Sequence, residues 1–290
     1  MASPLSAVNK KSTLGFTLVE MVTVILILGI LVVGVSSFII FGTRIFVESS
    51  SVDQVLSQSR FAVERMTREL RSALPNSLRV NTDSLTYQCI EFVPIEASTT
   101  YLTMPIIPDA AASTGIVILD NTVSAIRVNQ FAWIYPLIDA DVYSSARQKR
   151  AQVKTIATSP SPLEHQVTLT FTAPTRFAEA SPRQRIYFGS SPVSYCFEKG
   201  PSGNELQLLR YAGYNFNAVQ PNPAAMPTTM GTGVLMAQSV ANVLNNGADL
   251  PLILTPSSLV NNAMVHLQPR FNVNGETFQY RHQVQVINVP

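Results

Sequence analysis

The hydrophobic pattern of this chain begins with one long apolar segment near the N-terminus. Met21–Phe41 reads MVTVILILGILVVGVSSFIIF and contains no charged residue. A helix of this length, rising 1.5 Å per residue, spans the hydrocarbon core of a bilayer, which is about 30 Å thick. Lys10 and Lys11 precede the segment and favour a cytoplasmic N-terminus. The pattern predicts one transmembrane helix over residues 21–41 with the rest of the chain outside the cytoplasm.

Beyond Arg44 the sequence becomes amphipathic and predicts that the helix continues. Apolar residues recur there at spacings of three, four or seven, which places them on one helical face. They are Val52, Val55, Leu56, Val63, Met66, Leu70 and Ala73. The opposite face is charged, and Glu64 and Arg68 have the spacing of a favourable ion pair. Pro75 disfavours helical geometry at the preceding residue, so the predicted helix covers residues 16–74.

After Pro75 the periodicity changes to that of strands separated by Pro, Ser, Asn and Gly clusters, which predicts an antiparallel β domain. Residues 198–204 predict the turn of a β-hairpin. Gly233–Val243 fits a short helix or a strand equally well. The predicted strands are Ser77–Val80, Leu85–Val93, Gly115–Leu119, Ser124–Val128, Gln166–Phe171, Arg185–Phe188, Val193–Phe197, Glu205–Tyr211, Ala263–Phe271 and Gln279–Asn288.

Composition supports a folded, β-rich domain outside the cytoplasm. The 290-residue chain is 46% hydrophobic and only 13% charged, with 19 Pro and 13 Gly, whereas disordered chains are apolar-poor and charge-rich. A net charge of +2 gives no electrostatic case for a nucleic-acid partner. Two cysteines, Cys89 and Cys196, are too few for a thiolate zinc site. In an oxidising compartment they are expected to form one disulfide, with two unpaired buried thiols as the alternative.

Candidate chemistry in this region is sparse. The three histidines, His165, His266 and His282, have no metalloprotease or zinc-site spacing. Asp139 and Asp141 lie one residue apart, where they would supply part of a calcium site, but no full set of oxygen ligands surrounds them. We therefore expect no catalytic site, cofactor or metal.

Two further features have a functional and a structural interpretation. Arg147–Arg150 is the densest basic cluster and would suit contact with a nucleic acid, but a solvated loop is the favoured interpretation. Trp133 would suit an exposed anchor for a partner, but a core aromatic residue is favoured. No nucleic-acid partner is therefore expected.

The residues around the start of the apolar segment form a recognisable motif. Lys10-Lys11 is followed by Gly15-Phe16-Thr17-Leu18-Val19-Glu20 and then by the apolar helix. This arrangement resembles the class III signal of type IV prepilins. The resemblance implies cleavage after Gly15 by prepilin peptidase and N-methylation of the new terminus at Phe16. Because the leader precedes the apolar helix, cleavage would leave the membrane anchor in place.

Glu20 is the only charge at the edge of the apolar segment. A carboxylate near hydrocarbon is costly unless it is paired. Removal of the leader exposes an α-amine at Phe16, and Glu20 of one chain would meet this amine of a neighbour when the helices stack with an axial offset. This pairing would set the register between subunits. The alternative is an interfacial carboxylate that reaches into the lipid headgroups.

A wider resemblance involves both ends of the chain. The segments 42–44, 57–77, 89–94 and 282–290 resemble the MshO family, minor pilin-like proteins of mannose-sensitive hemagglutinin (MSHA) pilus systems. The helix-plus-β plan is also similar to PilW-type minor pilins and to the minor pseudopilins of type II secretion. The resemblance implies a structural subunit that helps to start assembly, and the large head favours a position at the pilus tip. A pseudopilin of a type II secretion or competence machine is the alternative.

The predicted organisation is therefore an α+β, pilin-like protein. It comprises a leader (1–15), an N-terminal helix (16–74) whose first half is transmembrane, and a periplasmic β-rich head (75–290). The resemblance implies that the chain resides in the inner membrane. The implied partners are prepilin peptidase, other minor and major pilins, the inner-membrane assembly platform and membrane lipid. The charged face of the helix is interpreted as solvated, with contact to a neighbouring subunit as the alternative.

Overall fold

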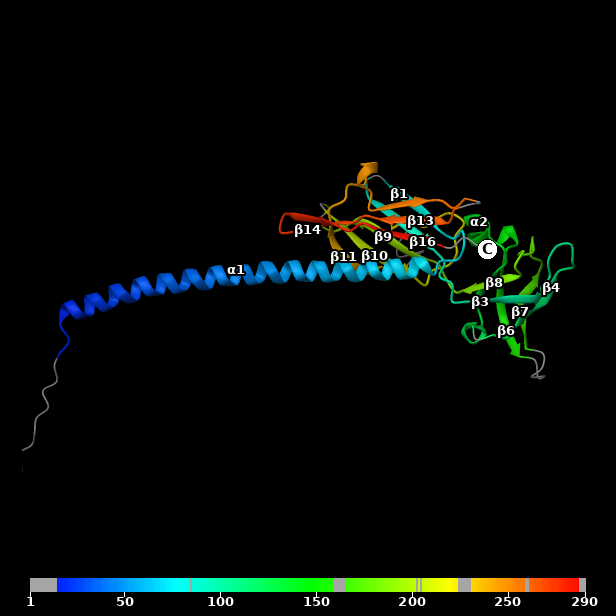
Figure 1. The fold of residues 1–290 in the computed structure, drawn as a ribbon, viewed down its shortest axis with the longest axis horizontal. Helices are drawn as coiled ribbons and strands as arrows, with labels where there is room; N and C mark the ends of the chain where they lie inside the picture. Colours follow the sequence, from blue (N-terminus) through cyan, green and yellow to red (C-terminus); the bar gives the residue numbers. More distant parts are fainter. Residues whose placement is uncertain are drawn as a thin grey trace, which may run out of the picture. The chain divides into compact units, whose positions relative to one another are not determined.

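The structure is a computed structural model. It describes residues 15–83, 85–120, 122–158, 165–201, 203, 205–223, 231–258 and 261–286. The chain divides into two compact units, Met1–Val52 and Asp53–Pro290. Helix α1 (Leu18–Arg71) begins in the first unit and ends in the second, and the remainder of the second unit is mainly antiparallel β structure (Figure 1). The predicted α+β class, with a long apolar N-terminal helix and a large antiparallel β domain, is confirmed.

At the end of α1, backbone hydrogen bonds within the helix give way to hydrogen bonds with the segment that follows β2. The helix ends at Arg71, three residues earlier than the predicted end at Leu74. Leu74 N donates to Val93 O (2.7 Å), and Ala73 forms an isolated bridge with Pro94. The residues just before Pro75 are thus already extended, because that proline disfavours helical geometry at its predecessor.

A seven-stranded antiparallel sheet forms the body of the second unit, with strand order β1-β2-β9-β10-β11-β14-β15. The predicted hairpin is present as the β9–β10 pair. The strands of this sheet are β1 (Arg79–Asp83), β2 (Tyr87–Phe92), β9 (Val193–Lys199), β10 (Leu206–Ala212), β11 (Val234–Val240), β14 (Arg270–Val273) and β15 (Glu276–Gln279).

The last two turns of α1 bury their apolar stripe in the main core. Val63, Met66 and Leu70 are buried in one cluster with side chains of β2, β9 and β10. A three-stranded sheet, with order β12-β13-β16, contributes Val265 and Val284 to the same cluster. Its strands are β12 (Leu252–Thr255), β13 (Ala263–Leu267) and β16 (His282–Val286). The periodicity of the helix therefore predicted its buried face correctly.

A closed six-stranded barrel, in the order β3-β4-β7-β6-β5-β8, is the feature that the sequence did not predict. It has its own core, which includes Val117, Leu169 and Phe188. Three short helical elements lie between barrel strands in the sequence: η1 (Val123–Ala125), α2 (Asp139–Tyr143) and η2 (Ser145–Arg147). A further one, η4 (Gly247–Asp249), precedes β12. The barrel strands are β3 (Ala97–Thr103), β4 (Ala112–Ile118), β5 (Phe131–Trp133), β6 (Arg150–Thr158), β7 (Gln166–Thr175) and β8 (Arg185–Gly189).

Two strand predictions are wrong. Ser124–Val128 is not a strand, because Val123 and Ile126 are both buried in the barrel core, and their spacing of three residues fits the helical turn η1. Ala263–Phe271 is not one strand but two, β13 and β14, which belong to different sheets. The undecided segment Gly233–Val243 contains strand β11.

The predicted disulfide is present between Cys89 and Cys196. The two residues lie directly opposite each other on β2 and β9, with their Cα atoms 4.1 Å apart. They are 107 residues apart in sequence, and the barrel strands all lie within the loop that the disulfide closes. A crosslink over a loop of this size stabilises the fold by about 4–5 kcal/mol in the chain-entropy account.

Glu69 ties the end of α1 to strand β10. It accepts hydrogen bonds from Arg65 on the same helix (3.0 Å) and from Arg210 on β10 (2.9 Å). Burial favours a higher pKa for Glu69, but the two arginines outweigh it and lower this pKa below the ordinary value of 4.5. The helical ion pair that forms is therefore Arg65–Glu69, and no ion pair between Glu64 and Arg68 is found in the described part of the chain.

Glu69→Gln is expected to lower the free energy of unfolding of the full-length protein by about 1 kcal/mol at neutral pH. A carboxyl group whose folded pKa is lowered contributes stability above its unfolded pKa and loses this contribution as the pH falls through its folded pKa. The difference in the free energy of unfolding between wild type and variant should therefore become smaller below about pH 4.5. Urea unfolding in detergent at a series of pH values measures it, with Glu64→Gln as the matched control. A difference that is constant with pH would contradict the role given to Glu69.

Candidate functional site

The predicted processing point lies in exposed, non-helical backbone just before helix α1. Gly15, Phe16 and Thr17 are outside the helix, and Phe16 is 80% exposed. The Gly15–Phe16 bond is therefore accessible from the solvent. Lys10 and Lys11, the predicted leader charges, lie outside the described residues.

Thr17 and Glu20 define the first turn of α1. Thr17 Oγ1 accepts a hydrogen bond from the backbone N–H of Glu20 (3.3 Å), as an N-cap threonine does. Glu20 is exposed and its carboxylate lies at the helix N-terminus, where the helix dipole favours negative charge. The sequence Thr17-Leu18-Val19-Glu20 thus starts the helix immediately after Phe16. The register-setting role of Glu20 requires a second chain and stays a prediction.

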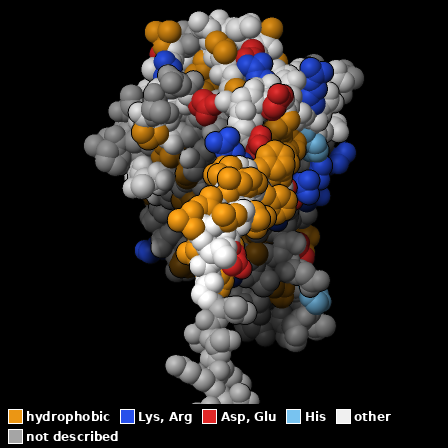
Figure 2. Space-filling model, turned by 90° about the vertical axis from the view of Figure 1, so that its left-hand side faces the viewer, with side chains coloured by type: hydrophobic (Ala, Val, Ile, Leu, Met, Phe, Trp, Pro, Cys, Tyr) orange, Lys and Arg blue, Asp and Glu red, His pale blue; other side chains and the backbone are white. Residues whose placement is uncertain are grey.

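The apolar side chains of residues 21–41, which follow Glu20, are exposed in the single chain. Figure 2, in which α1 is seen from its N-terminal end, shows hydrophobic side chains gathered over this helix. Among them, Ile25 is 64% and Val33 is 67% exposed. α1 is the one helix in the described residues that is long and apolar enough to cross a membrane, which is consistent with membrane anchoring. These side chains are stable only in lipid or against other apolar helices.

The charged residues buried in the second unit join its sheet to its barrel. Arg79 on β1 forms an ion pair with Glu91 on β2 (2.5 Å) and lies 3.6 Å from the ring centroid of Tyr143. Tyr214 donates its hydroxyl to Glu91 (2.9 Å). Burial raises the pKa of Glu91 above its ordinary value, and the Arg79 charge opposes this rise. The neighbours of Glu91 satisfy both of its oxygens, so this cluster is structural in character.

The basic cluster Arg147–Arg150 is only in part the solvated loop that was predicted, because Arg147 and Gln148 are exposed whereas Lys149 and Arg150 are not. Lys149 is 4% exposed and binds Glu179, and Arg147 binds the buried Asp141 (2.9 Å). Arg150 lies over the rings of Phe131 and Phe216, and burial lowers the pKa of Arg150 to about 10. The prediction is wrong for Lys149 and Arg150 because Lys149 binds the carboxylate of Glu179 and Arg150 lies against two aromatic rings, and these partners are distant in sequence.

Trp133 and Asp141, the remaining candidates from the sequence, are buried and hydrogen-bonded within the fold. Trp133 is fully buried and donates its ring N–H to Val142 O (3.2 Å), as a core aromatic would. Asp141 accepts hydrogen bonds from the backbone N–H groups of Leu137 and Ile138 in addition to Arg147. No cluster of three or more potential metal-ligating side chains occurs within the described ranges.

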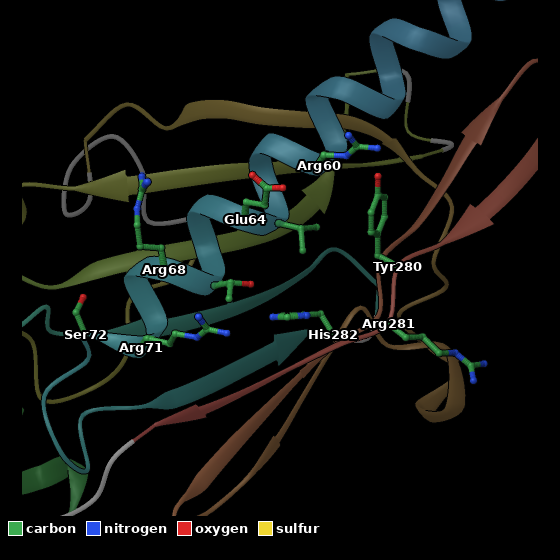
Figure 3. Close-up of a pocket in the computed structure, with 10 residues that line it drawn as sticks. Arg60, Glu64, Arg68, Arg71, Ser72, Tyr280, Arg281 and His282 are labelled. Carbon is green, nitrogen blue, oxygen red and sulfur yellow. The ribbon is translucent and has the colours of Figure 1, made fainter.

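Sequence reasoning missed a groove on the charged face of α1. The groove has a volume of about 820 Å³ and lies between residues 60–72, at the end of α1 and just beyond it, and residues 280–282, which lead into β16 (Figure 3). Arg60, Arg68 and Arg71 line it from the helix, and Arg281 and His282 line it from the other side. Only the spacing of the three helical arginines was visible in the sequence, because the second wall comes from more than 200 residues further along the chain.

The comparisons with known proteins agree with the N-terminal motif. Residues 10–36 match the family model of the prokaryotic N-terminal methylation motif. No curated protein and no solved structure matches the chain. The chain therefore carries a type IV prepilin-like methylation motif together with a long apolar helix. Such a motif implies processing by prepilin peptidase and association with pilins.

Arg79→Met is expected to lower the free energy of unfolding by about 3–5 kcal/mol, because it leaves the carboxylate of Glu91 buried without its charge partner. The double variant Arg79→Met/Glu91→Gln should be clearly more stable than Arg79→Met, since no unpaired charge then remains. Denaturant unfolding of the detergent-solubilised protein measures both values. If the two substitutions prove additive, Arg79 and Glu91 do not act as a pair.

Proposed function

We propose that this chain is a minor pilin-like structural subunit that helps to start the assembly of an MSHA-type IV pilus, and that it has no enzymatic activity. Its leader, residues 1–15, is removed by prepilin peptidase, and Phe16 becomes the methylated N-terminus. The subunit is held in the inner membrane by residues 21–41, with its β-rich head in the periplasm, and a head of this size is best accommodated at the pilus tip.

One observation carries the proposal. The methylation motif at residues 10–36 coincides with an exposed Gly15–Phe16 bond, a helix that starts at Leu18 and an apolar surface that no part of the described chain covers. A secretory signal peptide would be removed together with its apolar core, whereas cleavage at Gly15 retains the apolar helix in the mature protein.

The mechanism follows from the chemistry of α1. Before assembly, lipid covers the apolar side chains of the helix. Leaving the bilayer becomes possible when other pilin helices bury the same side chains. In that apolar environment the Glu20 carboxylate and the Phe16 amine of a neighbour are each costly alone, and their pairing removes both costs. The pairing fixes the axial offset between neighbouring helices, and the head selects which subunits lie beside it.

The assignment to an MSHA-type system rests on the resemblance of segments 42–44, 57–77, 89–94 and 282–290 to minor subunits of that system. A pseudopilin of a type II secretion or competence machine would use the same cleavage and the same helix packing. Deletion of the gene separates the two, because loss of surface pili supports the proposal and loss of secretion or DNA uptake with normal pili supports the alternative.

The mature protein is expected to begin at Phe16 with one added methyl group. Intact-mass and N-terminal peptide mass spectrometry of the protein from cells with and without prepilin peptidase measures this. Loss of residues 1–15 should depend on the peptidase, because the Gly15–Phe16 bond lies in the motif that this enzyme processes.

The control is the total amount of membrane-bound protein, which should be the same in both strains. An intact leader in the presence of the peptidase, or cleavage beyond Phe41, would overturn the proposed processing and reopen the question of an enzymatic function.

Glu20→Ala is expected to leave membrane insertion normal and to reduce incorporation into the assembled filament by about tenfold or more, a change equivalent to about 1.4 kcal/mol. The variant leaves the amine of a neighbouring Phe16 unpaired among apolar helices. The measurement is the ratio of this protein in sheared filaments to that in the membrane. Glu48→Ala, an exposed carboxylate of α1 beyond the apolar run, is the control. Equal incorporation of Glu20→Ala and wild type would remove Glu20 from the mechanism.

A further inference from the structure

The groove on the charged face of α1 is open and has two walls of different character. Arg60, Glu64, Arg68 and Arg71 follow one another along the helix wall, and Tyr280 and His282 approach from the strand side (Figure 3). Enclosed pockets bury most of a small ligand, whereas this groove lies at the surface and its helical arginines are exposed. Its form suits a segment of another protein better than a small molecule.

The groove carries an uncompensated positive charge. Among its lining residues there are four arginines and one glutamate. Arg60, Arg68 and Arg71 make no ion pair with any described residue, in contrast to Arg65 and Arg210, which both bind Glu69. The lone acid Glu64 is likewise unpaired within the described ranges. Arginine presents a planar fork of donors that matches a carboxylate, so the groove is suited to acidic side chains.

Two buried polar atoms in the same lining lack partners. Thr67, which is 7% exposed, and His282 both line the groove. Thr67 Oγ1 and His282 Nε2 have no hydrogen-bond partner in the described part of the chain. Buried polar atoms are nearly always hydrogen-bonded, and leaving one unsatisfied costs about 1–3 kcal/mol. Because both atoms are buried, they lie beneath the accessible surface of the groove.

A second copy of this chain is a poor occupant. Its acidic residues are scattered along the sequence and form no acidic run. The two that lie closest together are Asp139 and Asp141, and Asp141 is 2% exposed and binds Arg147. The charge complementarity must therefore come from a different protein.

We propose that the groove between residues 60–72 and Tyr280–His282 binds an acidic segment from the head of another pilin-type subunit. Carboxylates of that segment bind Arg60, Arg68 and Arg71. Val63 and Tyr280 provide the apolar floor. This inference rests on the proposed function and identifies the surface by which the subunit selects a neighbour. It is independent of the Phe16–Glu20 pairing, which involves the other end of α1.

The first test is charge reversal in the full-length protein in its native cells. Arg68→Glu/Arg71→Glu is expected to reduce incorporation into filaments by about tenfold or more, because like charges then face the acidic segment. The matched control is Arg183→Glu/Arg185→Glu, which changes the net charge equally at exposed positions in and beside β8 of the barrel. Membrane level and leader cleavage should be normal in both variants.

The second test identifies the occupant. A photo-crosslinking amino acid at Glu64, which is exposed in the centre of the helix wall, should link to an acid-rich peptide of another protein with an N-terminal methylation motif. The same group at exposed Asp109 of the barrel is the control. The crosslink should be lost in Arg68→Glu/Arg71→Glu and restored when acids of the linked peptide are changed to lysine.

The outcomes separate this inference from the proposed function. Wild-type protein in the filaments together with equal incorporation of the Arg68→Glu/Arg71→Glu variant would overturn the inference alone. Crosslinks only to a second copy, to lipid or to nucleic acid, or no crosslink at all, would also overturn it. If wild-type protein is neither cleaved nor present in filaments, the proposed function fails and the inference fails with it.

Discussion

The exposed apolar surface of the first half of α1 is the constraint on which the rest of the molecule depends. No described residue of the chain covers this surface, so it must be covered by lipid or by other helices. A buried helix of a soluble domain would satisfy its apolar side chains within its own chain. A bilayer and a bundle of similar helices would both satisfy this sequence, and the proposed assembly would transfer the helix from the first to the second.

The second half of α1 is instead packed against the head. It buries a narrow apolar stripe against β2, β9 and β10, and Glu69 connects it to β10 through Arg210. The helix is thereby fixed to the seven-stranded sheet at its C-terminal end. The disulfide between β2 and β9 and the buried Arg79–Glu91 pair stabilise the same sheet, and Arg79 also contacts Tyr143. The helix is therefore attached to a sheet that is held together by both a covalent crosslink and a buried ion pair.

Features that depend on local sequence were predictable. The apolar run, the buried stripe of α1 and the β9–β10 hairpin follow from periodicity and turn residues, which act over a few positions. The barrel was missed because β5 has only three residues and β6 (RAQVKTIAT) has no clear alternation. Such strands are fixed by neighbours distant in sequence. The buried environment of Arg150 was missed for the same reason, since Phe216 lies far along the chain.

In the proposed function, the two halves of α1 would have different tasks in assembly. Apolar contact and the Glu20 carboxylate would act alike for every chain with the same motif, because all such chains would present the same amine and the same kind of helix. They would give a common register but little discrimination between subunits. The groove beside Arg68 and Arg71 differs, since its unpaired positive charges favour an acidic surface and disfavour others. The proposed minor subunit would need both properties, because it would have to enter the common helical array and also take a particular place in it.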